Sequence, residues 1–299
     1  MGETRNGTRT KLHAPPMVGG LSTFAGQYDL ILCDVWGVIH NGVAAFPSAC
    51  DALEQVRAGG ASVVLVSNAP RPNRFIMGML DGLGVPRTAY DAIVTSGDVT
   101  RDMLEARPGA LVFHLGPPRD VGTFEGLDMT LVPLEEADLV VCTGLLDDDV
   151  ETPDDYRDTL AAMKARALPL ICANPDLVVE RGDKLIFCAG AIALAYEEIG
   201  GKAFWCGKPY RPIYDTAFAR AEVIRGGVIE RARVLGIGDA LRTDITGANE
   251  AGFDSLFISG GIHAQELKSI DGAVPDTESL AELFTGHAHP RGVMPRLAW

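Results

Sequence analysis

The sequence predicts an α/β fold in which a doubly wound parallel sheet carries a second, inserted α/β domain. Two observations predict the sheet: apolar strand patterns alternate with amphipathic helix patterns near the N-terminus, and the same alternation returns after residue 205. A third observation predicts the insertion, because the stretch between these halves has strand and helix patterns of its own. The core is therefore expected to be discontinuous along the chain.

The first half of the core begins with an apolar run, Tyr28 to Val35, which is typical of a strand buried on both faces. Pro47 favours the first turn of a helix, and Gly59–Gly60 ends that helix. Ala61 to Val66 is a second buried strand, and another helix pattern starts near Pro72. This order predicts parallel strands with helices on both faces, as in Rossmann-like folds.

The second half repeats this order. A helix pattern begins at Arg211–Pro212, a strand pattern covers Arg233 to Ile237, a short helix is expected over Thr243 to Ala251, and a further strand over Phe253 to Ile258. The predicted segments are an N-terminal flexible arm (1–20), a core (21–87 and 205–285), an inserted domain (88–204) and a C-terminal tail (286–299).

Composition excludes several classes of protein. With 299 residues, 47% of them hydrophobic and 22% charged, the chain is long and apolar enough for about two folded domains. Its net charge of −14 repels nucleic acids and anionic membrane surfaces, so neither is an expected partner. The six cysteines form no C-x-x-C pair and the N-terminus lacks a signal-peptide pattern, so we expect a cytoplasmic location.

Polar side chains follow the predicted strands at the points where these strands end. Asp34 follows the first strand, Ser67 and Asn68 follow the second, and Asp239 and Asp244 come after the strand that begins at Arg233. A single aspartate in such a place is often only a helix cap. Several such clusters at the carboxyl ends of parallel strands predict instead a shared ligand site.

The residue types at this site suit phosphoryl chemistry. Asp34 and Asp239 offer oxygen ligands for Mg²⁺, and Lys208, in Gly207-Lys208-Pro209, supplies a positive charge. The hydroxyl of Ser67 can hold phosphoryl oxygens. A carboxylate beside a metal and a lysine stays ionised, so Asp34 can attack phosphorus and form an aspartyl-phosphate.

These motifs resemble those of the haloacid dehalogenase (HAD) superfamily of phosphatases. The run Asp34-Val35-Trp36-Gly37-Val38 stands where that family has D-x-D-G-x, Ser67-Asn68 is similar to the second motif, Lys208 to the third, and Gly238 to Asp244 to the fourth. An insertion between the second and third motifs is the arrangement of the class IIA branch with a type-two cap. Asn174-Pro175-Asp176 resembles the N-P-D element of that branch, and the resemblance covers about residues 24–262.

The resemblance implies a role for each matching residue. Asp34 would be the nucleophile and a metal ligand, and the metal would be Mg²⁺, held also by the carbonyl of Trp36 and by Asp239 and Asp244. Lys208 would act in catalysis and, with its neighbours, bind the substrate; the implied substrate-binding residues are Ser67, Asn68, Lys208, Asn174 and Asp176. The implied substrate is a small phosphorylated metabolite, and the branch also allows a homodimer formed through the cap.

Trp36 departs from the family pattern. Phosphatases of this family place a second aspartate there, which protonates the leaving oxygen and later deprotonates water, and an indole does neither. Three interpretations stay open: a phosphatase with slow turnover, a phosphometabolite-binding or regulatory protein with little turnover, and a phosphotransferase. His40 is close enough in sequence to substitute, although a histidine there more often lines a loop. Trp36 itself suits either a core or lid position or stacking on a substrate ring.

Other residues near the predicted site have simpler interpretations. Cys33 and Cys206 flank the site, and we expect them to be small buried residues without a reactive role. Arg71, Arg74 and Arg242 lie in or near the site loops and are candidates to clamp an anionic substrate, although exposed arginines are common.

Overall fold

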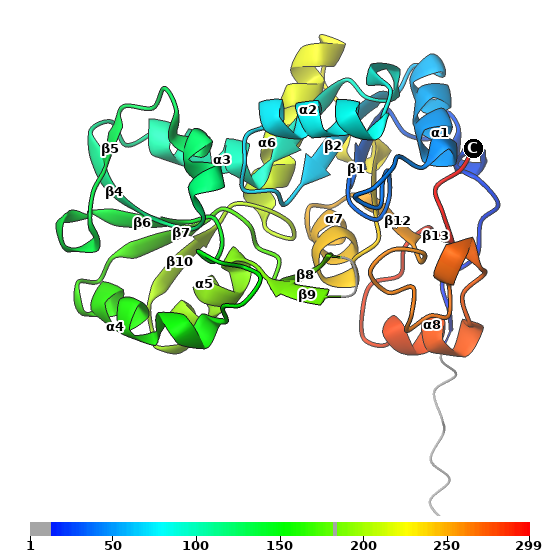
Figure 1. The fold of residues 1–299 in the computed structure, drawn as a ribbon. Helices are drawn as coiled ribbons and strands as arrows, with labels where there is room; N and C mark the ends of the chain where they lie inside the picture. Colours follow the sequence, from blue (N-terminus) through cyan, green and yellow to red (C-terminus); the bar gives the residue numbers. More distant parts are fainter. Residues whose placement is uncertain (1–12, 182–183) are drawn as a thin grey trace, which may run out of the picture.

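The computed structural model describes residues 13–181 and 184–299, which form two lobes (Figure 1). Within these residues, the core lobe contains a six-stranded parallel sheet in the order β13-β12-β11-β1-β2-β3. Its strands are β1 (Leu30–Cys33), β2 (Ser62–Ser67), β3 (Ala92–Thr95), β11 (Val234–Gly238), β12 (Asp254–Ile258) and β13 (Gly292–Met294).

Helices cover both faces of the core sheet because its central strands are apolar on both faces. Alternate side chains of β1 enter different clusters: Ile31 packs with the side of α1 and α2, and Leu32 packs with the side of α6 and α7. The helices of the core and its junction with the cap are α1 (Pro47–Ala58), α2 (Asn73–Leu83), α3 (Ser96–Glu105), α6 (Arg211–Arg225), α7 (Thr246–Glu250) and α8 (Thr277–Leu283).

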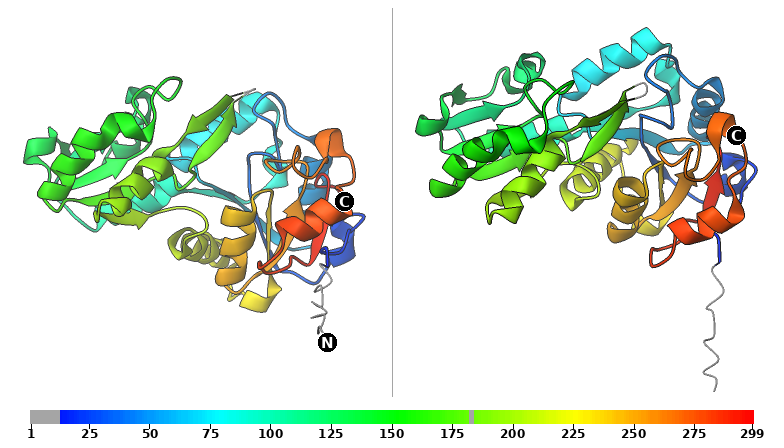
Figure 2. Two further views of the ribbon diagram at one scale, coloured as in Figure 1. Left: turned by 90° about the horizontal axis from the view of Figure 1, so that it is seen from below. Right: turned by 60° about the horizontal axis from the view of Figure 1, so that its bottom comes forward.

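The second lobe, called the cap below, is built from the middle of the chain (green in Figure 1). The described residues give it a five-stranded parallel sheet, β10-β7-β6-β4-β5, and an antiparallel hairpin, β8–β9, that projects toward the core (Figure 2). Its elements are β4 (Ala110–Leu115), β5 (Met129–Leu131), β6 (Leu139–Cys142), α4 (Arg157–Ala165), β7 (Pro169–Cys172), β8 (Val178–Arg181), β9 (Lys184–Phe187), α5 (Ala189–Glu198) and β10 (Lys202–Trp205). The predicted fold class, a parallel-sheet core with an inserted α/β cap, is confirmed.

The core sheet extends beyond the boundaries that the sequence suggested. β3 pairs with β2 although residues 88–204 were expected to belong to the insertion, and β13 pairs with β12 although residues 286–299 were expected to be a tail. These strands have four and three residues, too few for a hydrophobic period to be read. Pairing with a longer neighbour, rather than local pattern, places them in the sheet.

Part of the predicted flexible arm is also ordered. Residues 1–12 lie outside the described residues, but Met17 forms a β-bridge with Val293, and the N–H of Val18 donates to the Val293 carbonyl at 3.0 Å. The expectation of a flexible arm is therefore wrong for residues 13–20. The composition of residues 13–20 does not indicate that they pair with Val293, which lies more than 250 residues away along the chain.

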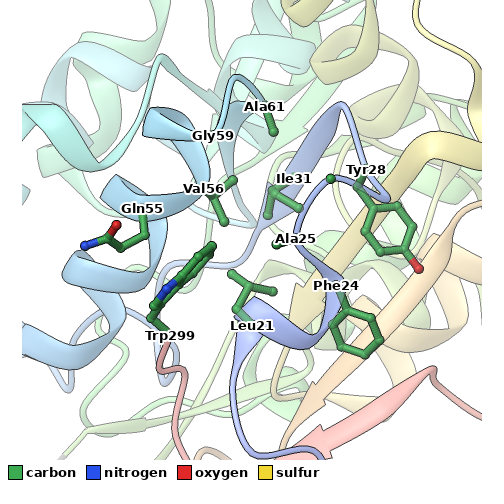
Figure 3. A pocket seen from close by; sticks show the side chains of 11 residues that line it. Leu21, Phe24, Ala25, Tyr28, Ile31, Gln55, Val56, Gly59, Ala61 and Trp299 are labelled. Carbon is green, nitrogen blue, oxygen red and sulfur yellow. The ribbon is translucent and has the colours of Figure 1, made fainter.

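Residues 21–28 and the C-terminal Trp299 meet at a small pocket beside α1 (Figure 3). Trp299 faces Leu21 and Val56 across it, and the N–H of Leu21 donates to the carbonyl of Ala298 at 2.8 Å. The pocket has a volume of about 50 Å³, too little for a metabolite, and none of the predicted site residues lines it.

Candidate active site and metal centre

Three aspartates that are far apart in the sequence converge at the carboxyl edge of the core sheet. Asp34 directly follows β1, Asp239 directly follows β11, and Asp244 lies in the helical turn Leu241–Ile245. One carboxylate oxygen of each lies within 4.8 Å of the other two, and all three residues are buried. The parallel pairing of β1 with β11 brings the first two together, since it continues into a 2.8 Å hydrogen bond from the Asp34 N–H to the Ile237 carbonyl.

Lys208 lies among these carboxylates. Its Nζ forms an ion pair with Oδ1 of Asp34 and another, at 2.6 Å, with Oδ1 of Asp244. Only 4% of Lys208 is exposed, so both pairs are shielded from water. The predicted third-motif lysine is thus in direct contact with the predicted nucleophile.

The charges of the cluster do not balance within the protein. Three carboxylates face one ammonium, and burial raises the pKa of Asp34 to about 7 despite the opposing effect of Lys208. Burial, together with repulsion from Asp34 and Asp244, also holds the pKa of Asp239 well above its ordinary range. Burial alone would lower the pKa of Lys208, but Asp244 and Asp34 together raise it. A divalent cation would neutralise the two excess negative charges.

The donor set fits Mg²⁺. The cation is hard, and it is usually held by one or a few carboxylates while it keeps several water molecules. Asp34, Asp239 and Asp244 offer such carboxylates at one point, and Asp239 is fixed there by the N–H of Ile262, which donates to its Oδ2 at 2.8 Å. The three carboxylates therefore form a candidate Mg²⁺ site.

Glycines allow the backbone to approach the carboxylates closely. A Cβ on Gly261 would lie 1.9 Å from Oδ2 of Asp239, and one on Gly238 would lie 2.1 Å from Cγ of Asp244. Gly37, with φ of +77°, would place a Cβ 2.1 Å from the same Asp239 oxygen. The Trp36–Gly37 backbone therefore runs beside the cluster of three carboxylates. Sequence reasoning missed Gly261 and Ile262, for which the only signal is the Gly260–Gly261 pair after β12.

Asn68 connects the second motif to the third. Its Oδ1 accepts the N–H of Lys208 at 2.7 Å, and its Nδ2 donates to the Lys208 carbonyl at 3.2 Å. These two bonds hold the Lys208 backbone at the end of β2. Ser67 is the last residue of β2 and is half-buried, and its Oγ accepts the N–H of Ala69 at 3.2 Å.

The N-P-D segment of the cap contacts the core at this site. Nδ2 of Asn68 also donates to Oδ1 of Asp176 at 2.9 Å, and Arg242 donates to the Pro175 carbonyl at 2.9 Å. Oδ1 of Asn174 accepts the N–H of Asp176 at 3.1 Å, so this side chain shapes the turn. Burial raises the pKa of Asp176. The structure thus brings Asn68 and Asp176 together and assigns Arg242 to the contact between the lobes.

The remaining predicted neighbours have simple environments. Cys33 and Cys206 are buried, and burial raises the pKa of both thiols, as expected for residues without a reactive role. Arg74 pairs with Glu125 at 2.7 Å, and the guanidinium of Arg71 lies 4.5 Å from the ring centroid of Phe75.

His40 lines the loop that follows the first motif. It is fully buried, and its Nδ1 accepts the N–H of Gly42 at 2.9 Å. Its ring meets that of Trp36 edge to face, with centroids 5.2 Å apart, and Trp36 remains 45% exposed. Burial lowers the pKa of His40 to about 4. These contacts favour the loop-lining interpretation of His40 over the acid–base one.

Comparisons with known proteins agree with this geometry. A family model described as haloacid dehalogenase-like hydrolase matches residues 31–130, and a second, described as HAD-hydrolase-like, matches residues 205–283. A crystal structure of a haloacid dehalogenase-like hydrolase from Brucella suis 1330 is 45% identical, with a TM-score of 0.82 over 94% of this chain and 100% of that chain.

Two further relatives are more distant. The ribonucleotide monophosphatase NagD of Escherichia coli (strain K12) is 25% identical over 81% of this chain and 90% of its own length. The glycerol phosphate phosphatase of Mycobacterium tuberculosis, solved in complex with magnesium, is 26% identical, with a TM-score of 0.64 over 87% of this chain and 78% of that chain. Together with the converging motifs, these matches show that the chain belongs to the haloacid dehalogenase-like hydrolase family.

Proposed function

We propose that the protein is a Mg²⁺-dependent phosphoric monoester hydrolase that acts on a small phosphorylated metabolite through a phosphoryl group carried by Asp34. The observation that carries the proposal is the contact of buried Lys208 with Asp34 and Asp244 beside Asp239. The named relatives are phosphatases of small phosphate esters, which supports the same chemistry.

Each residue of the cluster has a part in this reaction. Bound Mg²⁺, held by Asp34, Asp239 and Asp244 with the carbonyl of Trp36, would supply positive charge against the phosphoryl oxygens. Asp34 directs its second oxygen at phosphorus, and the bond from phosphorus to the leaving oxygen breaks. Lys208, already paired with Asp34, offsets the charge that develops on the transferred group.

Binding and closure involve the loops around this cluster. Ser67 binds the phosphoryl group through its hydroxyl, and Asn68 contributes its backbone N–H, because its side-chain amide is engaged by Lys208 and Asp176. Asn174 and Asp176 belong to the cap segment that covers the site, and the contacts of Asp176 and Pro175 with the core support a closed lobe arrangement that excludes water. Location in the cytoplasm and a homodimer through the cap are part of the same proposal. The cysteine spacing supports the first and the class IIA resemblance supports the second.

Trp36 leaves the first step without a proton donor at the usual position. General acid–base help contributes about 10²–10⁴-fold, so the reaction is slow for esters with poor leaving groups. Acyl and aryl phosphates need the missing acid least. His40 does not supply it, because its Nδ1 is engaged by Gly42 and the residue is fully buried.

The test is a screen of phosphate release with Mg²⁺ across aryl, acyl, sugar and nucleotide phosphates for the wild type, Asp34→Asn and Trp36→Asp. We expect release from aryl or acyl phosphates by the wild type, a gain on alkyl esters in Trp36→Asp, and no release in Asp34→Asn. Mg²⁺-dependent binding without release in both the wild type and Trp36→Asp would instead identify a binding or regulatory protein. Transfer to an added alcohol in place of water would identify a phosphotransferase.

A further inference from the structure

The indole of Trp36 is held in place by its surroundings while much of it stays open to solvent. Trp36 is 45% exposed although it directly precedes Gly37, whose backbone abuts Asp239. A β-bridge joins Trp36 to His40, and the Gly37 N–H donates to the His40 carbonyl at 2.9 Å. The loop from Trp36 to His40 thus closes on itself next to the three carboxylates.

Two residues of this loop fix the ring. A Cβ on Gly42, with φ of +83°, would lie 2.3 Å from an atom at the edge of the Trp36 indole, so only a glycine lets the ring settle there. On another side, the imidazole of His40 meets the indole at 85°. The ring is thereby oriented before any ligand arrives.

The hydrogen bonding of His40 suits this positioning role. Because Nδ1 accepts the Gly42 N–H, the proton of the neutral ring is on Nε2. Nε2 is buried without a hydrogen-bond partner among the described residues. The imidazole packs edge to face with the indole of Trp36, with ring centroids 5.2 Å apart. His40 therefore stabilises the loop and packs on the indole, and we assign it no contact with a substrate.

From this geometry we propose that Trp36 is a specificity-determining residue that stacks on a flat leaving group of the phosphoester, with His40 as the residue that positions it. The inference rests on the proposed function and names the substrate class within it: phosphates whose bridging oxygen is carried by an aryl, enol or acyl carbon. Indole stacks well on flat unsaturated groups, and a glycerol offers no such face.

The chemistry of the missing acid leads to the same class. When Asp34 attacks phosphorus, the electron pair of the breaking bond goes to the leaving oxygen, which departs as an anion and takes its proton from water afterwards. Phenolates, enolates and carboxylates tolerate that charge, and the carbon that carries the oxygen is planar in all three. Trp36 cannot donate a proton to the leaving oxygen, so the favoured leaving groups are those that depart as stable anions. These groups are flat, and the indole of Trp36 is a flat surface on which they can stack.

Binding of two inert ligands tests the inference. Phenylphosphonate and methylphosphonate share the anionic head and differ in the ring, and neither is hydrolysed at its carbon–phosphorus bond. With Mg²⁺, we expect the wild type to bind phenylphosphonate about tenfold more tightly, in line with the usual strength of aromatic stacking. Trp36→Leu retains the backbone carbonyl and should lose this preference, so the ratio of the two affinities is the readout, and circular dichroism shows whether the variant is folded.

Fluorescence tests the role of His40. The chain has three tryptophans, and replacing Trp205 and Trp299 by phenylalanine leaves Trp36 as the only indole emitter. In this background, phenylphosphonate should change the Trp36 emission and methylphosphonate should not. His40→Phe keeps a ring but no acceptor for the Gly42 N–H. It should lower the Trp36 anisotropy and the preference for phenylphosphonate, with methylphosphonate binding unchanged.

Each result has one meaning. Equal affinity of the wild type for the two phosphonates, with Mg²⁺-dependent binding of both, would overturn the stacking role and leave the proposed function standing. Mg²⁺-independent binding, or no binding of either phosphonate, would overturn the proposed function and the inference with it. Unchanged Trp36 anisotropy in His40→Phe would show that His40 does not position the indole.

Discussion

Nδ2 of Asn68, in the core, donates a 2.9 Å hydrogen bond to Oδ1 of Asp176, in the cap. The same amide also donates to the carbonyl of Lys208, so one side chain joins the second motif, the third motif and the cap. Arg242 adds a second contact between the lobes through the Pro175 carbonyl. The N-P-D segment is therefore docked on the loops of the catalytic cluster.

We expect Asp176→Ala to loosen the closed arrangement of the lobes. A hydrogen bond to a charged group contributes about 1.5–3 kcal/mol, and only the Arg242 contact would remain of these two. Small-angle scattering without ligand should show a larger radius of gyration than in the wild type. Asp176→Asn keeps an acceptor oxygen and is the matched control. Identical scattering of the alanine variant and the wild type would show that this bond does not hold the cap.

Gly261→Ala should weaken Mg²⁺ binding by tenfold or more. The new Cβ would lie 1.9 Å from Oδ2 of Asp239, so the carboxylate has to move away from the other two ligands. Calorimetric titration with Mg²⁺ measures the effect. Gly227→Ala is the control, since a Cβ there meets nothing within 4 Å and only the same methyl group is added. Equal Mg²⁺ affinities of the two variants would contradict the prediction, because they would show that displacing the Asp239 carboxylate does not affect Mg²⁺ binding.

Stability of the cap should decrease as the pH falls from about 6.5 toward 4. Burial lowers the pKa of His114 from its ordinary value of 6.5 to about 4, and its Nε2 lies 2.8 Å from Oγ1 of Thr143. The unfolded chain binds this proton at a higher pH than the folded chain, so its contribution is complete above 6.5 and is lost on acidification. Urea unfolding midpoints across this range should fall less steeply in His114→Gln. Equal slopes in His114→Gln and the wild type would contradict the assignment, because other buried groups, Asp34 among them, titrate in both proteins.

The sequence was sufficient for the class of the core and for the residues at the ends of its strands. β1 is apolar throughout and β2 is apolar between its two terminal serines, which marks them as central strands. Parallel strands bring Asp34 and Asp239 to one edge of the sheet. Lys208 could be assigned because the glycine and proline beside it mark the turn that precedes α6. The roles given to these side chains in catalysis and binding stay predictions.

Short and distant pairings could not be predicted. β3 and β13 are recognisable only once their longer neighbours are placed, and the bridge between Met17 and Val293 joins segments at opposite ends of the chain. The close approach of Gly261 to Asp239 depends on the path of the loop after β12. Likewise, the edge-to-face packing of His40 on Trp36 arises from a closed loop, which residue order alone does not specify.

Trapping the phosphorylated enzyme tests the central claim most directly. The wild type, mixed with Mg²⁺ and p-nitrophenyl phosphate and quenched in acid, should carry a phosphoryl group on the peptide that contains Asp34. Because Trp36 provides no base to activate water for the second step, this species should accumulate, and Trp36→Asp should shorten its lifetime. Asp34→Asn should show neither the modification nor phosphate release. Full phosphate release by Asp34→Asn, with no modified peptide in the wild type, would contradict the account.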